Sequence, residues 1–274
     1  MGGTVSVRRM ARALITGCST GIGRAAAVEL TKRGYEVVAT ARRVETLTDL
    51  DVAETLALDV DDDASVHDAV AAAGPVDVLV NNAGFGVGGP VESVPLDEVR
   101  RMYETNVFGA VRMMQAVVPG MRERGSGAIV NVSSVSGRVA APLAGFYAST
   151  KYALEAVSEA LHYEVGHFGI RVVLIEPGAI ETSFGENSRA LGVEGGPYEE
   201  LARQFESANE KLGGGGPAPG PELVATAVAE SLEADPPRLR WPVGADAELV
   251  IATRTAMDDE SFEQAMRQTL DITW

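Results

Sequence analysis

The chain has 274 residues, of which 46% are hydrophobic, and its 39 acidic and 23 basic residues give a formal net charge of −16. This charge argues against nucleic acid as a partner, because phosphate binding requires a basic face. No apolar run approaches the ~18 residues of a membrane-spanning helix, and residues 1–10 lack the apolar core of a secretory signal.

Residues 12–178 alternate between short apolar runs and helical patterns, which indicates βαβ units and a parallel sheet. We expect strands at Ala13–Ile15, Tyr35–Thr40, Thr55–Leu58, Val76–Val80, Ala128–Val132 and Arg171–Ile175. Helices are expected at Arg24–Arg33, Leu96–Arg124 and Phe146–Phe168. The Val, Ile and Leu content of the strands is typical of strands that helices cover on both faces. The sequence therefore predicts an α/β fold, a single-domain Rossmann-type doubly wound parallel sheet over residues 11–274, after a flexible N-terminal arm of residues 1–10.

After Pro177 this alternation stops. Residues 183–220 contain several glycines, among them the run at 213–216, and are too long for an ordinary connection. We interpret them as a mobile substrate lid with short helices after the sixth strand, and the alternative is a disordered insertion. A helix at Leu223–Leu232, an extended segment or late strand at Trp241–Val243 and a helical tail at Asp258–Leu270 are expected to follow.

A glycine-rich turn follows the first strand directly, with the sequence Thr16-Gly17-Cys18-Ser19-Thr20-Gly21-Ile22-Gly23. Gly17 can adopt a backbone conformation that larger residues avoid, Gly21 lets a pyrophosphate approach the main chain, and Gly23 allows tight helix packing on the strand. N–H groups and the dipole at the start of the helix supply a positive field for an anion. The pattern predicts a dinucleotide cradle, with an ordinary glycine turn as the alternative.

The end of the second strand carries the signal for the type of dinucleotide. An Asp or Glu there accepts hydrogen bonds from the ribose hydroxyls of NAD and repels a 2′-phosphate. The sequence here is Ala39-Thr40-Ala41-Arg42-Arg43, with no carboxylate before Glu45. A guanidinium can bind the 2′-phosphate bidentately, so Arg42 predicts NADP(H) as the preferred cofactor and NAD(H) as the alternative. In the competing interpretation Arg42 and Arg43 are solvated surface charges.

Tyr147 and Lys151 are four residues apart, a spacing that puts both side chains on one face of a helix. A free tyrosine, with a pKa near ~10, is a poor acid or base at neutral pH. A cation ~4 Å away at an effective dielectric of ~20 contributes up to ~4 kcal/mol, or roughly three pK units, while burial of the phenol acts in the opposite direction. Tyr147 is therefore a candidate acid/base, and Ser134 at the end of the fifth strand is a candidate donor to a substrate carbonyl.

Taken together, these motifs resemble those of the short-chain dehydrogenase/reductase family. The matching segments are Thr16-Gly17-x-x-x-Gly21-Ile22-Gly23, Leu58-Asp59-Val60, Asn81-Asn82-Ala83-Gly84, Asn106, Ser133-Ser134, Tyr147-x-x-x-Lys151 and Pro177-Gly178-x-Ile180-x-Thr182. They span residues 16–182 in the order and at the spacing of the family. Phe85-Gly86, Gly145-Phe146-Tyr147-Ala148 and the end of the second strand look like members related to 17β-hydroxysteroid and retinol dehydrogenases.

The resemblance implies a role for each matching residue. Tyr147 is expected to exchange the proton, Ser134 to hold the substrate oxygen, and Lys151 to bind the nicotinamide ribose and tune Tyr147. Asn106 is expected to keep a water in the proton relay behind Lys151. The other expected cofactor contacts are Gly17, Ser19, Thr20, Gly21, Ile22, Arg42, Asp59, Val60, Asn82, Ala83, Gly84, Pro177, Gly178, Ile180 and Thr182. Other NADP-preferring members carry a basic residue where this chain has Thr20.

Hydride transfer requires a pocket that holds the reacting carbon against the nicotinamide and excludes water. Apolar residues near the motifs are expected to form it: Phe85, Val87, Leu143, Phe146 and Phe184, with Tyr198 and Trp241 as further candidates. Each aromatic residue can instead belong to the ordinary core. The set favours a hydrophobic ketone or alcohol over a sugar or a charged acid.

We therefore expect an NADP(H)-dependent oxidoreductase that interconverts a carbonyl and a secondary alcohol on a hydrophobic small molecule. Within enzymes, the alternative is a tailoring ketoreductase or an epimerising or dehydrating member of the same fold. In a different class, the alternative is a non-catalytic NADP-sensing binding protein, although such a protein does not need the proton relay.

The three histidines have neither the spacing nor the neighbours of a metal site, so no metal is expected. The single cysteine excludes an internal disulfide framework and indicates the cytoplasm. The resemblance implies a homodimer or homotetramer that forms through the two long helices. Candidate contacts are Ala110, Met113, Met114, Ala153, Ala156, Val157 and Ala160, and the alternative is that these residues face the sheet.

Overall fold

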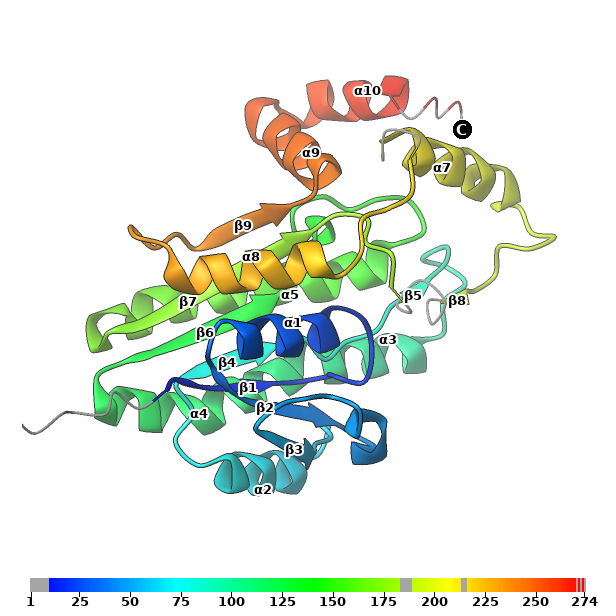
Figure 1. Cartoon of the computed structure of the whole chain (residues 1–274). Coiled ribbons are helices and arrows are strands. Elements are labelled where there is room, and N and C mark those ends of the chain that lie inside the picture. The colour runs from blue at the N-terminus through cyan, green and yellow to red at the C-terminus, as the bar shows by residue number, and fades with distance from the viewer. Residues whose placement is uncertain (1–9, 183–188, 213–215, 270, 272, 274) are drawn as a thin grey trace, which may run out of the picture.

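The computed structural model describes residues 10–182, 189–212, 216–269, 271 and 273. Its centre is a seven-stranded parallel sheet of order β3-β2-β1-β4-β6-β7-β9 (Figure 1). Its strands are β1 (Arg12–Ile15), β2 (Glu36–Ala41), β3 (Glu54–Ala57), β4 (Val78–Asn81), β6 (Gly127–Val132), β7 (Ile170–Pro177) and β9 (Arg240–Val243). The order reverses between β1 and β4, so the chain winds outward from this point in both directions. The prediction of a single doubly wound α/β domain is confirmed.

The strands lie within two residues of their predicted positions. The late segment around Trp241 is the seventh strand of the sheet, paired in parallel with β7 through Ile175 and Trp241. Its indole is buried and donates a hydrogen bond to the Arg238 carbonyl at 3.2 Å. Trp241 therefore belongs to the core and not to a substrate pocket, which corrects the pocket interpretation of this residue.

Helices cover both faces of the sheet because alternate strand residues point in opposite directions. On one face, Ala13 and Ile15 of β1 pack in a core with α1 (Gly21–Lys32) and α8 (Glu222–Glu233). On the other face, Leu14 packs in a second core with α2 (Asp63–Ala73), α4 (Ala110–Arg124) and α5 (Gly145–Val165). The sequence did not predict α2, whose N-cap Asp62 accepts a hydrogen bond from the Ser65 amide at 2.8 Å.

The predicted long helix Leu96–Arg124 is divided into three parts. An α-helical part, α3 (Leu96–Tyr103), runs into a π-helical segment, η2 (Glu104–Gly109), and then into α4. A π-helical turn inserts one extra residue per turn and is frequent at functional sites. The prediction of one uniform helix is therefore corrected, and the π-helical segment contains Asn106.

The two sets of candidate contact residues differ in their surroundings. Ala110, Met113 and Met114 on α4 are buried in the core against the sheet. On α5, in contrast, Ala156, Val157 and Ala160 are exposed. The alternative of packing on the sheet therefore holds for the α4 residues, and only the α5 residues stay available for a contact between subunits.

The remaining described elements lie mostly beyond the sixth strand of the sheet, β7. The predicted lid region contains β8 (Arg189–Ala190), which pairs with β5 (Val87–Gly88), and α7 (Glu199–Leu212). The mobility of this region stays a prediction. The tail forms α10 (Asp259–Thr269), preceded by α9 (Ala245–Ala256), which the sequence did not predict. In Figure 1, α7, α9 and α10 stand together at the top of the view, away from the body of the sheet.

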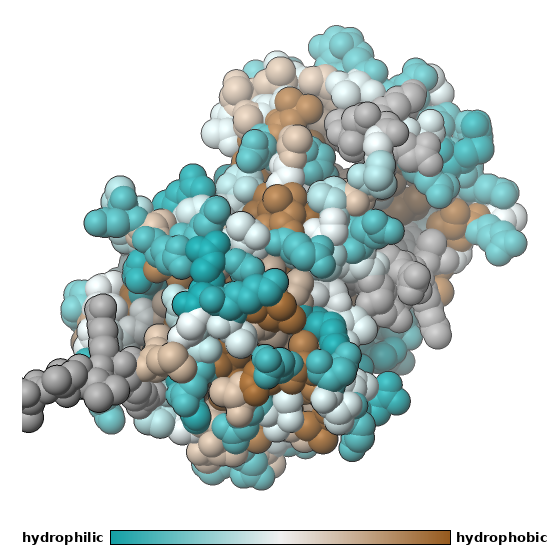
Figure 2. All heavy atoms as spheres, in the orientation of Figure 1, coloured by the Kyte–Doolittle hydropathy of each residue, from teal (hydrophilic) through white to brown (hydrophobic). Residues whose placement is uncertain are grey.

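Short 3₁₀-helices complete the described structure: η1 (Val44–Leu47), η3 (Val135–Gly137) and η4 (Gly166–Phe168). Polar residues cover most of the face seen in Figure 2, and apolar residues gather there in small separate patches. Among the residues that the structure describes, no helix is long and apolar enough to cross a bilayer.

Replacement of Met113 by Ala tests the packing of α4 on the sheet. Met113 has no exposed surface, so Met113→Ala leaves a cavity and is expected to lower the free energy of unfolding by about 2–5 kcal/mol. Urea denaturation followed by circular dichroism measures this change. Leu249→Ala on α9, where the side chain is 56% exposed, is the control and is expected to change stability by no more than about 0.5 kcal/mol. Equal effects of the two substitutions would contradict the assignment of α4 to the core.

Candidate active site

A single cleft of about 1030 Å³ runs along the carboxyl ends of the strands. Six of the seven strands deliver residues to it within two positions of their last residue. The cleft-lining residues at these ends are Gly17 after β1, Arg42 after β2, Leu58 after β3, Asn82 after β4, Ser133 after β6 and Gly178 after β7. Open parallel sheets bind ligands at this edge, where the strand order reverses.

The glycine turn after β1 is held against the segment that follows β4. The Thr16 hydroxyl accepts hydrogen bonds from the Asn82 and Ala83 amides, both at 3.0 Å. In return, the Asn82 side-chain amide donates to the Thr16 carbonyl at 2.9 Å and to the Gly17 carbonyl at 3.1 Å. A Cβ atom at Gly23 would lie 2.3 Å from the Asn82 side-chain nitrogen, so only glycine fits there. Gly17 has a φ of +74°, as the sequence predicts for this turn.

The start of α1 lies at this cleft, because Thr20, Gly21 and Ile22 line it. Within the described residues, no side-chain capping hydrogen bond closes the α1 N-terminus, and its first turn holds no acidic residue. A helix N-terminus of this kind attracts an anion through its N–H groups and its dipole. Gly21, with a φ of +59°, faces Thr182 across the turn, where a Cβ atom would meet the threonine at 3.4 Å. These residues therefore fit the pyrophosphate of a dinucleotide.

Arg42 and Asp59 lie at the other end of the cleft. Arg42 is exposed, and it forms no ion pair with any residue that the structure describes. Asp59 and Val60 follow β3 and line the cleft beside it. A free guanidinium at the end of β2, without an acidic neighbour on that strand end, fits a 2′-phosphate.

Three of the four predicted catalytic residues meet in the middle of the cleft. Ser134 follows β6, while Tyr147 and Lys151 lie on successive turns of α5. The Tyr147 hydroxyl and the Ser134 side chain are hydrogen-bonded to each other. The Lys151 Nζ donates to the Val132 carbonyl at 2.9 Å and lies 5.8 Å from the centroid of the Tyr147 ring.

Burial shifts the pKa values of this pair in opposite directions. Burial raises the pKa of Tyr147 to about 12, and the hydrogen bond with Ser134 acts against this. Burial lowers the pKa of Lys151 to about 8, and the negative charge of Glu155 acts against this. Each shift reflects the cost of a charge away from water, which is larger here than the attraction that the sequence predicted between the two residues.

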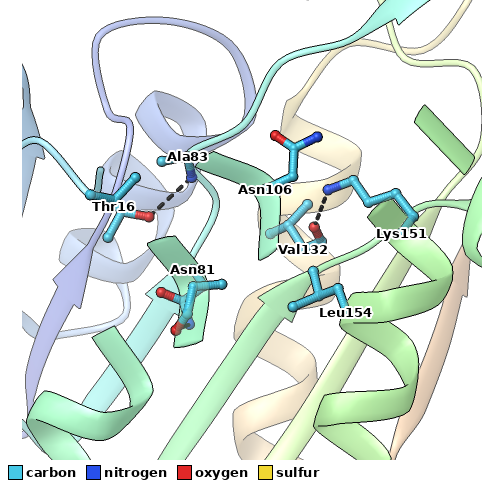
Figure 3. Close-up of a pocket in the computed structure, with 9 residues that line it drawn as sticks. Thr16, Asn81, Ala83, Asn106, Val132, Lys151 and Leu154 are labelled. Carbon is cyan, nitrogen blue, oxygen red and sulfur yellow. Dashed lines mark hydrogen bonds between the residues drawn. The ribbon is translucent and has the colours of Figure 1, made fainter. Parts of the chain in front are cut away.

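Asn106 lies behind Lys151 and binds the chain segment that follows β4. Its side chain donates to the Phe85 carbonyl at 2.9 Å and to the Thr150 hydroxyl at 3.1 Å, and it accepts from the Phe85 amide at 3.0 Å. Beside it is a small cavity of about 10 Å³, which Lys151 and Asn106 enter from different helices (Figure 3). This is about the volume that one buried water requires. The Asn81 side-chain oxygen, which lines the cavity, is buried without a partner among the described residues.

Every predicted cofactor residue lies on the cleft. They are Gly17, Ser19, Thr20, Gly21, Ile22, Arg42, Asp59, Val60, Asn82, Ala83, Gly84, Tyr147, Lys151, Pro177, Gly178, Ile180 and Thr182. The strand ends bring these residues together from positions far apart in the chain. Their roles in binding are taken up under the proposed function.

The predicted substrate residues are distributed less uniformly. Phe85 and Val87 line the cleft. Phe146 packs in a small core with Val87, and Leu143 accepts a hydrogen bond from the Gly89 amide at 2.7 Å through its carbonyl. Neither Phe146 nor Leu143 belongs to the described lining, and the same holds for Tyr198. Phe184 lies outside the described residues.

The helices α7, α9 and α10 supply cleft residues that the sequence did not reveal. These are Phe205 of α7, Asp246 and Val250 of α9, and Met266 of α10. Asp246 accepts a hydrogen bond from the Ala179 amide at 2.7 Å and thereby holds the segment after β7. No local motif marks these positions, although the amphipathic pattern of α7 and α10 indicates one apolar face on each helix.

Histidine, cysteine and acidic side chains do not gather into a metal site in the part of the chain that the structure describes. Cys18 is buried, and burial raises the pKa of its thiol to about 12. The thiol is therefore protonated at neutral pH and is a small filler of the glycine turn.

Comparison with known proteins agrees with this geometry. The family model for short chain dehydrogenases matches residues 11–191. This chain belongs to the short-chain dehydrogenase/reductase family, a class of oxidoreductases with a Rossmann-type sheet.

Relatives and solved structures support the same assignment. The uncharacterised oxidoreductase YusZ of Bacillus subtilis is 35% identical over 94% of this chain and 98% of its own length. A 3-ketodihydrosphingosine reductase of Bacteroides thetaiotaomicron is 40% identical over 70% of this chain and 72% of its own, and human retinol dehydrogenase 8 is 43% identical over 62% and 59%. A short-chain dehydrogenase of Burkholderia cenocepacia in complex with NADP superimposes with a TM-score of 0.78, at 26% identity over 94% of this chain and 98% of that one.

Proposed function

We propose that this protein is an NADP(H)-dependent oxidoreductase that interconverts a carbonyl and a secondary alcohol on a hydrophobic small molecule. The observation that carries the proposal is the hydrogen-bonded pair Ser134 and Tyr147 beside Lys151, in the same cleft as the glycine turn. A cleft that combines a dinucleotide cradle with an acid/base group suits hydride transfer coupled to proton transfer.

In the reductive direction, Tyr147 donates its hydroxyl proton to the substrate carbonyl oxygen, and Ser134 donates a hydrogen bond to the same oxygen. The bound nicotinamide supplies the hydride. Tyr147 holds its proton because burial raises its pKa to about 12. The Lys151 ammonium lies on the next helical turn, so its charge stabilises the phenolate that forms when the proton leaves.

A proton that Tyr147 gives away must be replaced from solvent. The cavity between Lys151 and Asn106 has space for a water, and the unpartnered Asn81 oxygen is an acceptor for it. Lys151 also keeps donors beyond the one that binds the Val132 carbonyl. Asn106 supports this relay by holding the segment of Phe85 beside it.

The substrate proposal rests on the apolar part of the cleft. Phe85, Val87, Val139, Phe205 and Val250 line it together with Met266. A retinol dehydrogenase and a 3-ketodihydrosphingosine reductase are among the relatives, and both names denote an apolar alcohol or ketone.

We place the protein in the cytoplasm, because its one cysteine is buried and unpaired.

Replacement of Tyr147 by Phe separates an enzyme from an NADP-sensing binding protein. Tyr147→Phe removes the proton donor but keeps the ring, so kcat/KM for an apolar ketone is expected to fall by about 10²–10⁴-fold. NADPH affinity, measured by fluorescence titration, is expected to stay close to that of the wild type. The reaction is followed by nicotinamide absorbance. Unchanged turnover in Tyr147→Phe would contradict the proposed chemistry, and product analysis distinguishes reduction from an epimerising or dehydrating reaction.

Replacement of Arg42 tests the proposed preference for NADP(H). A charge-assisted contact to the 2′-phosphate contributes about 1.5–3 kcal/mol, so Arg42→Ala is expected to raise the KM for NADPH about 10–100-fold. The KM for NADH should not change, since NADH lacks the phosphate. Arg43→Ala is the matched control, because Arg43 is also exposed but does not line the cleft. An equal rise in the KM for NADPH and in the KM for NADH would overturn the role of Arg42 as a contact to the 2′-phosphate.

We also propose that the protein forms a homodimer or homotetramer through the exposed face of α5. Tyr152, Val157 and Tyr163 of α5 and Phe108 of η2 are exposed apolar side chains. Light scattering at graded concentrations is expected to give a multiple of the 28.7 kDa chain mass, and Val157→Asp is expected to lower it. Leu249→Asp, a similar change on exposed α9, is the control. A wild type that is monomeric at every concentration would contradict this proposal.

A further inference from the structure

A third polar residue continues the line of Tyr147 and Lys151 along α5. Glu155 follows Lys151 by one helical turn, so the three side chains share one face of the helix. That face packs against η3 and β7 and is buried, and the Glu155 side chain keeps only 6% of its surface exposed. A buried carboxylate is costly unless a charge or a hydrogen bond compensates it.

The contacts of Glu155 compensate only one of its two oxygens. Oε2 accepts a hydrogen bond from the Arg240 Nε at 3.0 Å. Oε1 is buried without a partner among the described residues, as is the Ser133 hydroxyl. Both side chains crowd Gly137, where a Cβ atom would lie 2.8 Å from the Ser133 Oγ and 2.9 Å from the Glu155 Cγ. The loop that carries Ser134 is therefore packed directly on Glu155.

The other charges around Glu155 come from three elements. Arg240 of β9 also lies 2.6 Å from Glu159 and 3.5 Å from the buried Glu176 of β7. Arg138, after η3, binds Glu176 at 3.0 Å. Three carboxylates therefore share two guanidiniums. Burial raises the pKa of Glu176, and the nearby negative charge of Glu155 raises it further.

Lys151 lies one helical turn before Glu155 on α5 and lines the cleft. Burial lowers the pKa of Lys151 to about 8, and Glu155 is the charged group that opposes this effect. Because this value lies close to neutrality, a modest change in the surroundings decides whether Lys151 is charged under working conditions. Tyr147, the other titratable neighbour on the same helix face, carries no charge at neutral pH, since burial raises its pKa to about 12.

We propose that Glu155 is a positioning residue of the reaction: its buried carboxylate keeps Lys151 in the ammonium form beneath the cleft. The inference rests on the proposed function, in which the Lys151 charge stabilises the Tyr147 phenolate. Glu155 touches neither substrate nor dinucleotide and acts only through Lys151. The pair Arg240 and Glu155 then links the outer strand β9 to the catalytic helix.

Direct titration of Lys151 tests this inference without any assay of activity. The chain contains only three lysines, Lys32, Lys151 and Lys211, so [ε-¹³C]lysine labelling gives few signals. Lys151→Arg identifies the signal of Lys151 by its loss. In Glu155→Gln, the titration midpoint of Lys151 is expected to lie about one to two pH units below that of the wild type. A unit negative charge one helical turn away raises the pKa of a lysine by about this amount at an effective dielectric of about 20.

The matched control is Glu159→Gln, which removes the other helix carboxylate bound to Arg240 but lies one turn farther from Lys151. Its Lys151 midpoint is expected to stay at the wild-type value. Glu155→Met, which fills similar volume without charge, is a second neutral variant in case the buried amide prevents folding. A Lys151 midpoint that is the same in the wild type and in the folded neutral variants would overturn the inference.

The pH profile of turnover gives the second measurement. Activity that needs the ammonium is lost as pH rises through the pKa of Lys151, so the alkaline limb of kcat is expected to move to lower pH in Glu155→Gln by the same interval as the midpoint. A shifted midpoint in a protein without oxidoreductase activity would support the role of Glu155 and contradict the proposed function. If the titration midpoint of Lys151 moves in an active enzyme but the alkaline limb of the kcat profile does not, Glu155 does not influence the reaction through Lys151, and this part of the inference is overturned.

Discussion

The parallel pairing of β1 with β4 is the constraint on which the rest of the site depends. The register of Ile15 with Val80 makes both strands end at the same level. Thr16 and Asn82 then lie side by side and exchange four hydrogen bonds that include the neighbouring Gly17 and Ala83. Because the sheet reverses its strand order at this point, the two following connections diverge to opposite faces. The cleft opens between them, and the start of α1 faces into it.

Burial of charged groups is the second physical theme of the molecule. Lys151, Glu155 and Glu176 are buried although each carries an ionisable group. The two carboxylates are stabilised by guanidiniums: Arg240 of the edge strand β9 pairs with Glu155, and Arg138 after η3 pairs with Glu176. A low-dielectric surrounding strengthens each of these interactions and also makes the protonation states sensitive to them. Helix α5 is therefore coupled electrostatically to β9 and β7 through the ion pairs of Arg240 with Glu155 and Glu176.

Local patterns predicted the parts of the fold and of the site that local chemistry controls. The strands were recognisable because buried parallel strands are continuous apolar runs, and the glycine turn because few residues tolerate the φ of Gly17. The π-helical segment at Asn106 was not recognisable, since a hydrogen-bond shift inside a helix leaves no mark in residue type. For Trp241 the sequence left a pocket and the core both open, because an aromatic residue fits either equally well by composition, and the structure places it in the core.

The sequence by itself determined the order of the motifs, the fold class and the candidate residues for dinucleotide binding and proton transfer, because each of these depends on residue type and short spacing. Only the tertiary structure decided which residues meet across the chain. Asp246 reaches the segment after β7, Phe205 and Met266 line the cleft, and Arg240 binds Glu155. Contacts of this kind depend on the packing of elements far apart in sequence, where many residue types fill the same space and no short pattern records the partner.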